Sequence, residues 1–170
     1  MAALALIIAF VFGNLYKFSF FSPDVHLSLL DIVVFGLTIK SLFINHKSYL
    51  INHPLVPPTL VFFTLAFISL LLALPVYGWQ AILVGGMYLA RWLVYSLFFA
   101  SIVQLIKPPK IRKILLIMGI LTAVLGLAQY IIFPDIRSLT VSEWDPHYYR
   151  LVSTFLDPGF TGLILVFTLI

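Results

Sequence analysis

The chain has 170 residues, of which 62% are apolar and 9% are charged, and its net charge is +4. Soluble domains carry roughly 25% charged residues, so this composition excludes an ordinary soluble domain and favours a membrane protein. The chain contains no cysteine, which excludes disulfides and thiolate metal sites, and its basic residues cluster between apolar runs, which argues against a nucleic-acid partner.

Long apolar runs predict an all-α fold, a polytopic bundle of five transmembrane helices plus the start of a sixth. A helix needs about 20 apolar residues to cross hydrocarbon about 30 Å thick. The expected helices cover, in chain order, residues 1–16, 27–44, 57–75, 79–106, 114–133 and 158–170. The first run lacks the basic residues that precede a signal-peptide core, so it is expected to be retained.

The same pattern predicts one transmembrane domain over residues 1–170, with an outer loop at residues 134–157. The sixth apolar run has just begun when the sequence stops. We therefore expect the chain to be the N-terminal half of a larger membrane protein.

Basic residues predict the orientation of these helices. Segments 40–47 and 107–113 hold six of the ten lysines and arginines, and both fall on the same side if every run spans. The positive-inside rule makes that side cytoplasmic, so the N-terminus is expected to be cytoplasmic as well. The same pattern predicts that the lipid bilayer is a partner of this chain.

Arg91 is an anomalous residue because it lies near the middle of a long apolar run. A central arginine costs roughly 2.5–3.5 kcal/mol to insert, so it is expected to face polar groups or a wet cavity. One interpretation is an anion site, such as a site for a lipid phosphate. The other is pairing with Asp31 or with backbone carbonyls. Asp31 itself is expected near the outer end of its helix, facing water.

Motifs of a self-contained active site are absent from the sequence. The four histidines are scattered without ligand spacing, so neither a metal nor another cofactor is expected. There is no glycine-rich phosphate loop and no nucleophile elbow.

The most specific segment runs from Arg150 through a Ser-Thr-Phe sequence to Asp157 and Pro158. Asp157 is expected to be the N-cap of a helix and Pro158 its first residue. Free N–H groups at that helix start, together with Arg150, would favour an anion. The alternative is an ordinary capped helix start.

This segment resembles the signature of the O-antigen ligase and polysaccharide polymerase superfamily. Members carry an arginine, then Gly/Ser-Thr-Phe, then Asn/Asp-Pro-Asn at the start of a membrane helix. The matching residues are Arg150, Ser153, Thr154, Phe155, Asp157 and Pro158. Gly159 stands where the family has asparagine, and the match covers roughly a tenth of the chain.

The resemblance implies metal-independent glycosyl transfer, with an undecaprenyl-diphosphate-linked glycan as donor, outside the bacterial cytoplasmic membrane. It also implies that arginines hold the diphosphate, with Arg150 as first candidate and Arg91 as second. The family's catalytic histidine lies in a later external loop, so catalytic residues are expected beyond this chain, which alone should be inactive. The alternative function is a non-catalytic polytopic membrane protein, either a transporter fragment or an assembly scaffold.

Overall fold

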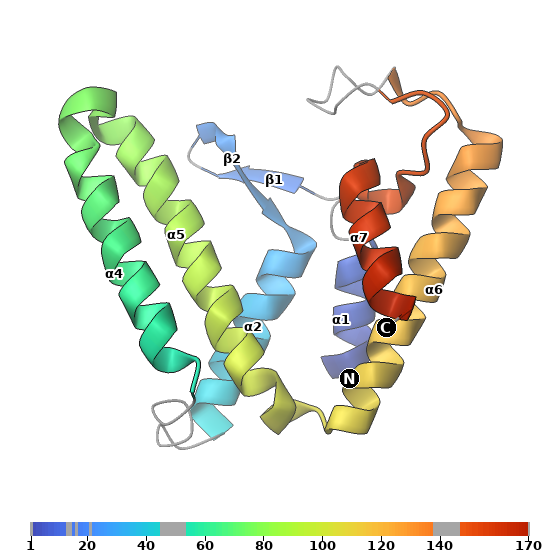
Figure 1. The fold of residues 1–170 in the computed structure, drawn as a ribbon, viewed down its shortest axis with the longest axis horizontal. Coiled ribbons are helices and arrows are strands. Elements are labelled where there is room, and N and C mark those ends of the chain that lie inside the picture. The colour runs from blue at the N-terminus through green and yellow to red at the C-terminus, as the bar shows by residue number, and fades with distance from the viewer. Residues whose placement is uncertain are drawn as a thin grey trace. The chain divides into compact units, whose positions relative to one another are not determined.

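The computed structural model describes residues 2–12, 15, 17–20, 22–44, 54–137 and 147–169. These residues form two compact units. One comprises mainly residues 17–107, and the other comprises mainly residues 3–16 and 108–170. Helices dominate both units, and a two-stranded sheet belongs to the first (Figure 1).

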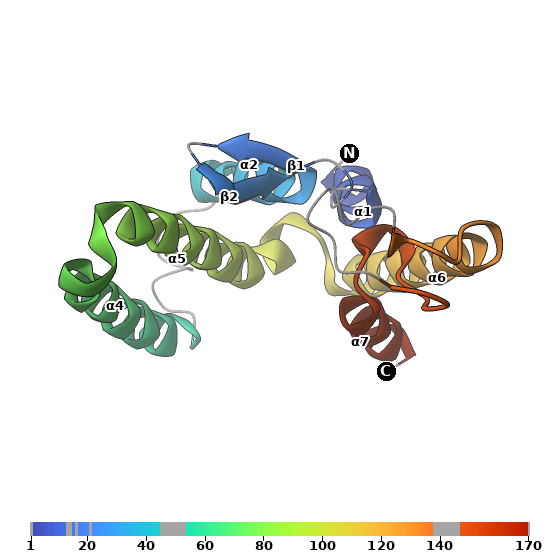
Figure 2. The same ribbon diagram turned by 90° about the horizontal axis from the view of Figure 1, so that it is seen from above.

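The unit of residues 17–107 begins with a β-hairpin that leads directly into a helix. Its elements are β1 (Lys17–Phe20), β2 (Ser22–Ser28), α2 (Leu29–Ile44), α4 (Val56–Leu72) and α5 (Leu74–Leu105). The two strands are antiparallel, with Lys17 opposite Ser28 and an irregularity between Ser19 and Phe20. Helix α5 packs against both α2 and α4, so it is the central helix of this unit (Figures 1 and 2).

Pro57 and Pro58 stand in the first turn of α4, where the missing N–H of proline costs no hydrogen bond.

A sharp turn joins the end of α4 to α5. Gly78 has φ 76° and ψ 174°, a conformation that side chains with a Cβ rarely adopt, and it separates one initial turn from the long part of α5. This break at Gly78 falls in the gap between the expected helices 57–75 and 79–106.

The second unit is built around one long helix. Its elements are α1 (Ala2–Phe12), α6 (Pro108–Ile132), the short 3₁₀ helix η3 (Ser153–Phe155) and α7 (Pro158–Leu169). Both η3 and α7 pack on α6. Phe155 contacts Phe10 of α1 and Phe160 of α7, with ring centroids 5.3 Å and 5.1 Å apart. Phe155 thus lies at the centre of this unit's core, where it is 4% exposed.

The prediction of five spanning helices and the start of a sixth is wrong. Among the described residues, two helices are long and apolar enough to cross a membrane, at Leu74–Ile102 and Pro108–Ile132. Helices α1, α2, α4 and α7 have 11, 16, 17 and 12 residues. At a rise of 1.5 Å per residue they fall short of about 30 Å.

The first expected helix illustrates why the apolar runs predicted too many membrane-spanning helices. It was expected to reach residue 16, yet α1 ends at Phe12 and β1 begins at Lys17. The stretch from Lys17 to Phe20 alternates polar and apolar residues, which is the strand period. A low local charge therefore does not distinguish one long helix from a short helix followed by a hairpin.

The two long helices differ from core helices of soluble proteins in their exposure. Only 6% of the apolar stretch in α5 and 28% of that in α6 is buried. Apolar helices left exposed over such lengths fit lipid contact better than contact with water. The structure therefore indicates membrane association through α5 and α6.

Candidate functional site

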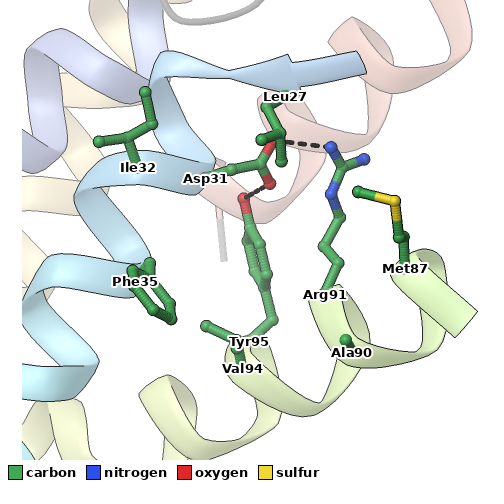
Figure 3. Close-up of a pocket in the computed structure, with 9 residues that line it drawn as sticks. All are labelled: Leu27, Asp31, Ile32, Phe35, Met87, Ala90, Arg91, Val94 and Tyr95. Carbon is green, nitrogen blue, oxygen red and sulfur yellow. Dashed lines mark hydrogen bonds and ion pairs between the residues drawn. The ribbon is translucent and has the colours of Figure 1, made fainter. Parts of the chain in front are cut away.

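A polar cluster joins three segments of the first unit around Arg91. The Nη2 atom of Arg91 donates to Asp31 Oδ2 at 2.8 Å and also to the backbone carbonyl of His26. The Tyr95 hydroxyl donates to the other oxygen of Asp31 at 3.0 Å. Arg91 also lies over the Tyr88 ring, 5.4 Å from its centroid. This cluster connects the hairpin and α2 to the middle of α5 (Figure 3).

Asp31 is oriented by the start of its own helix. Its Oδ2 accepts hydrogen bonds from the Ser28 N–H at 2.7 Å and from the Ser28 hydroxyl at 2.9 Å, while the Asp31 N–H donates to Ser28 Oγ at 3.2 Å. This reciprocal pattern is a capping box. These hydrogen bonds hold the carboxylate in the orientation in which it pairs with Arg91, and its side chain is only 11% exposed.

An open pocket of about 350 Å³ lies beside this cluster. Its lining is the polar trio of Asp31, Arg91 and Tyr95 together with apolar residues of the hairpin, α2 and α5. The apolar residues are Leu27, Ile32, Phe35, Met87, Ala90 and Val94. The pocket is thus a mainly apolar space with one polar edge (Figure 3).

The cluster decides between the interpretations of these residues that the sequence left open. Arg91 pairs with Asp31 and with a carbonyl, as the pairing interpretation expected. The expectation that Asp31 faces water is wrong, because the capping box and Arg91 enclose it. The sequence interpretation missed Ser28 and Tyr95. Their signals were the Ser-x-x-Asp spacing before an apolar run and the four-residue spacing of Tyr95 from Arg91.

The motif segment lies in the other unit, and hydrogen bonds connect it to neighbouring helices. The Ser153 hydroxyl donates to the Thr122 carbonyl of α6 at 2.9 Å, and the Thr154 hydroxyl donates to the Val11 carbonyl of α1. The Val152 N–H donates to the Gln129 side chain at 3.1 Å. Ser153 and Thr154 therefore anchor the segment to α6 and α1.

The predicted helix start at Asp157 is confirmed. Its Oδ1 accepts the Phe160 N–H at 2.7 Å, and α7 begins at Pro158. The side chain of Asp157 thereby occupies an N–H group that the anion-site interpretation required to be free. Arg150 is exposed, and no ion pair to it occurs in the part of the chain that the structure describes. Arg91 and Arg150 belong to different units, so neither unit brings the two arginines together.

The backbone around Arg150 is unusual. Tyr149, Ser153 and Leu156 have φ angles of 51°, 52° and 57°, in the left-handed region that non-glycine residues seldom adopt. Each such residue costs on the order of 1–3 kcal/mol and persists only where its surroundings hold it. Hydrogen bonds support each of these residues: the Tyr149 N–H donates to the Pro134 carbonyl, the Ser153 hydroxyl to the Thr122 carbonyl and the Leu156 N–H to the Val152 carbonyl.

A third polar group lies on the expected outer segment. The Arg137 side chain donates two hydrogen bonds to the Asp135 carboxylate, at 2.8 Å and 2.6 Å, and the Arg137 backbone N–H donates a third at 3.1 Å. The guanidinium also lies over the Tyr148 ring. These hydrogen bonds lower the pKa of Asp135 to about 2. Hydrogen bonding with Tyr149 raises the pKa of Tyr148. The pair is solvent-exposed, and most of the segment between it and Tyr148 lies outside the described residues.

Histidine and carboxylate side chains do not gather into a metal site anywhere within the described ranges. No protein family, curated protein or solved structure matches this chain.

Proposed function

We propose that this chain is part of a membrane protein that transfers glycans from an undecaprenyl-diphosphate donor, as a ligase or a polymerase. The observation that carries the proposal is the setting of Arg150. This exposed guanidinium lies in a strained segment, directly before a buried turn that resembles the O-antigen ligase signature. Backbone strain concentrates at functional sites, where the surrounding structure is built to hold it.

The proposed role of Arg150 is to hold the diphosphate leaving group. A guanidinium forms two parallel charge-assisted hydrogen bonds with phosphate oxygens, which the ammonium of lysine does not reproduce. Arg91 was the second candidate for this role. Its charge is already compensated by Asp31, so the proposal rests on Arg150 alone.

The test measures glycan transfer in cells from which the native gene has been deleted and in which the complete protein is expressed from a plasmid. Arg150→Ala is expected to lower transfer at least about tenfold, and Arg150→Lys to restore only part of it. The matched control is Arg137→Ala, which removes another exposed arginine that pairs with Asp135. Full transfer by Arg150→Ala, at equal protein level, would refute the role of Arg150.

A non-catalytic membrane protein, either a transporter fragment or an assembly scaffold, is the second candidate. One observation favours it. The hydroxyls of Ser153 and Thr154 are used in packing against α6 and α1, which gives these residues a structural reason to be present. Under this alternative, Arg150→Ala and Arg137→Ala leave glycan transfer equally unaffected.

We further propose that the protein lies in the bacterial cytoplasmic membrane as a multi-pass protein, with the basic segment 107–113 on the cytoplasmic side. Lys107, Lys110, Arg112 and Lys113 fall between the two helices long enough to span, which supports this orientation.

Cysteine labelling tests the orientation, and residues 1–170 contribute no cysteine of their own to the background. A membrane-impermeant maleimide applied to intact spheroplasts is expected to label Tyr149→Cys and to miss Lys110→Cys. Both variants should react after lysis. Labelling of Lys110→Cys from outside would reverse the orientation.

A further inference from the structure

The pocket beside Arg91 has the features of a ligand site that is distinct from the segment around Arg150. Its volume of about 350 Å³ lies within the range of small-molecule pockets, which are mostly apolar with a few placed polar groups. All of its lining residues belong to the unit of residues 17–107. The composition of the polar edge then decides which ligand fits.

Arg91 retains hydrogen-bond donors at this edge. A guanidinium has five N–H groups, and the two bonds of Arg91 both come from Nη2. Within the described residues no acceptor is found for Nε or Nη1, and Figure 3 shows one of these nitrogens turned away from Asp31. A ligand at this edge would therefore meet donors and should supply an acceptor oxygen.

Charge balance argues for an uncharged ligand. The Asp31 carboxylate, 2.8 Å away, already compensates the guanidinium. An anion added to this pair would leave a net negative charge in apolar surroundings, which is costly, whereas a carbonyl oxygen adds an acceptor without charge. Asp31 accepts four hydrogen bonds from Ser28, Arg91 and Tyr95, which leaves it little capacity for a cationic ligand.

We propose that this pocket binds an uncharged lipophilic molecule, with an ester or ketone oxygen on Arg91 and its hydrocarbon against Leu27, Phe35 and Met87. The pocket opens beside α5, one of the two helices able to cross a membrane, so a ligand dissolved in the bilayer would have access to it. This proposal does not depend on glycan transfer.

The experiment uses two photoreactive probes with the same chain, methyl dodecanoate and dodecanoate, each with the same terminal diazirine. The complete protein is labelled in a non-ionic detergent at about pH 9, where the carboxyl group of dodecanoate is ionised. Mass spectrometry then locates the adducts. The methyl ester is expected to label the pocket segments, residues 27–35 and 87–95, at least about tenfold more than dodecanoate.

Two variants sharpen the test. Ala90→Leu fills the pocket and is expected to abolish labelling by the ester, while Ala81→Leu, on α5 but outside the lining, should keep it. Asp31→Asn removes the compensating charge and is expected to reverse the preference towards dodecanoate. The helical circular dichroism of each variant verifies folding. If Asp31→Asn does not fold, the comparison of Ala90→Leu with Ala81→Leu tests the proposal.

Equal labelling by both probes, or undiminished labelling of Ala90→Leu, would mean that the probes coat apolar helix surfaces, and the proposal would fail. Absence of labelling in the pocket segments would also overturn it, because another part of the protein would then cover this space.

Discussion

Asp31→Ala is expected to destabilise the unit of residues 17–107 by about 3 kcal/mol. The change removes the capping box at the start of α2 and leaves Arg91 without its carboxylate. Loss of a cap costs about 1 kcal/mol, and an unpaired charge in apolar surroundings costs more. Because the Arg91 side chain is 31% exposed, the effect should stay below that of a fully buried pair.

The measurement is chemical unfolding in a mild detergent, followed by circular dichroism, for Asp31→Ala, Arg91→Met and the double variant. The double variant should lose clearly less than the sum of the two single losses, since each single change strands the other charge. Asp135→Ala is the matched control, because it breaks the exposed pair with Arg137 and should cause no measurable loss. Simple additivity of the two single changes would show that Asp31 and Arg91 act independently.

Gly119→Ala is expected to separate α7 from α6. A methyl group at this position would lie 2.0 Å from Thr168 Oγ1 and 2.2 Å from its Cγ2, so one helix must shift. Overpacking of this kind costs on the order of 1–3 kcal/mol. The branched Thr168 side chain cannot swing aside easily, because its hydroxyl also donates to the Ile164 carbonyl at 2.7 Å.

Limited proteolysis and thermal unfolding in detergent should report this loosening as faster cleavage around η3 and a lower midpoint. Gly162→Ala is the matched control on α7, where a methyl group would meet no atom within 4 Å. It should leave both measurements unchanged or slightly improved, since alanine favours helix over glycine. Identical behaviour of the two variants would show that α6 and α7 do not pack closely at Gly119.

The local chemistry of several residues was predictable from the sequence because it depends on near neighbours. The Asp157-Pro158 pair starts α7 as expected, since a cap needs only the next three residues. A polar partner for Arg91 was also predictable, because an arginine in an apolar helix cannot remain unpaired cheaply. Long apolar runs likewise placed the bodies of α5 and α6.

Tertiary structure decided the features that depend on contacts distant in sequence. The apolar run before Lys17 could not show that the chain turns into a hairpin at β1, because strand pairing requires its partner β2. That hairpin carries the His26 carbonyl to Arg91. The pairing of Asp31 with Arg91 spans 60 residues, and the buried Ser153 hydroxyl finds its acceptor 31 residues away. The low charge density of the sequence by itself determined that this chain favours apolar surroundings. Tertiary structure decided how many helices are long enough to cross a membrane. The physical reason is that a helix ends where its backbone N–H and C=O groups find hydrogen-bond partners outside the helix.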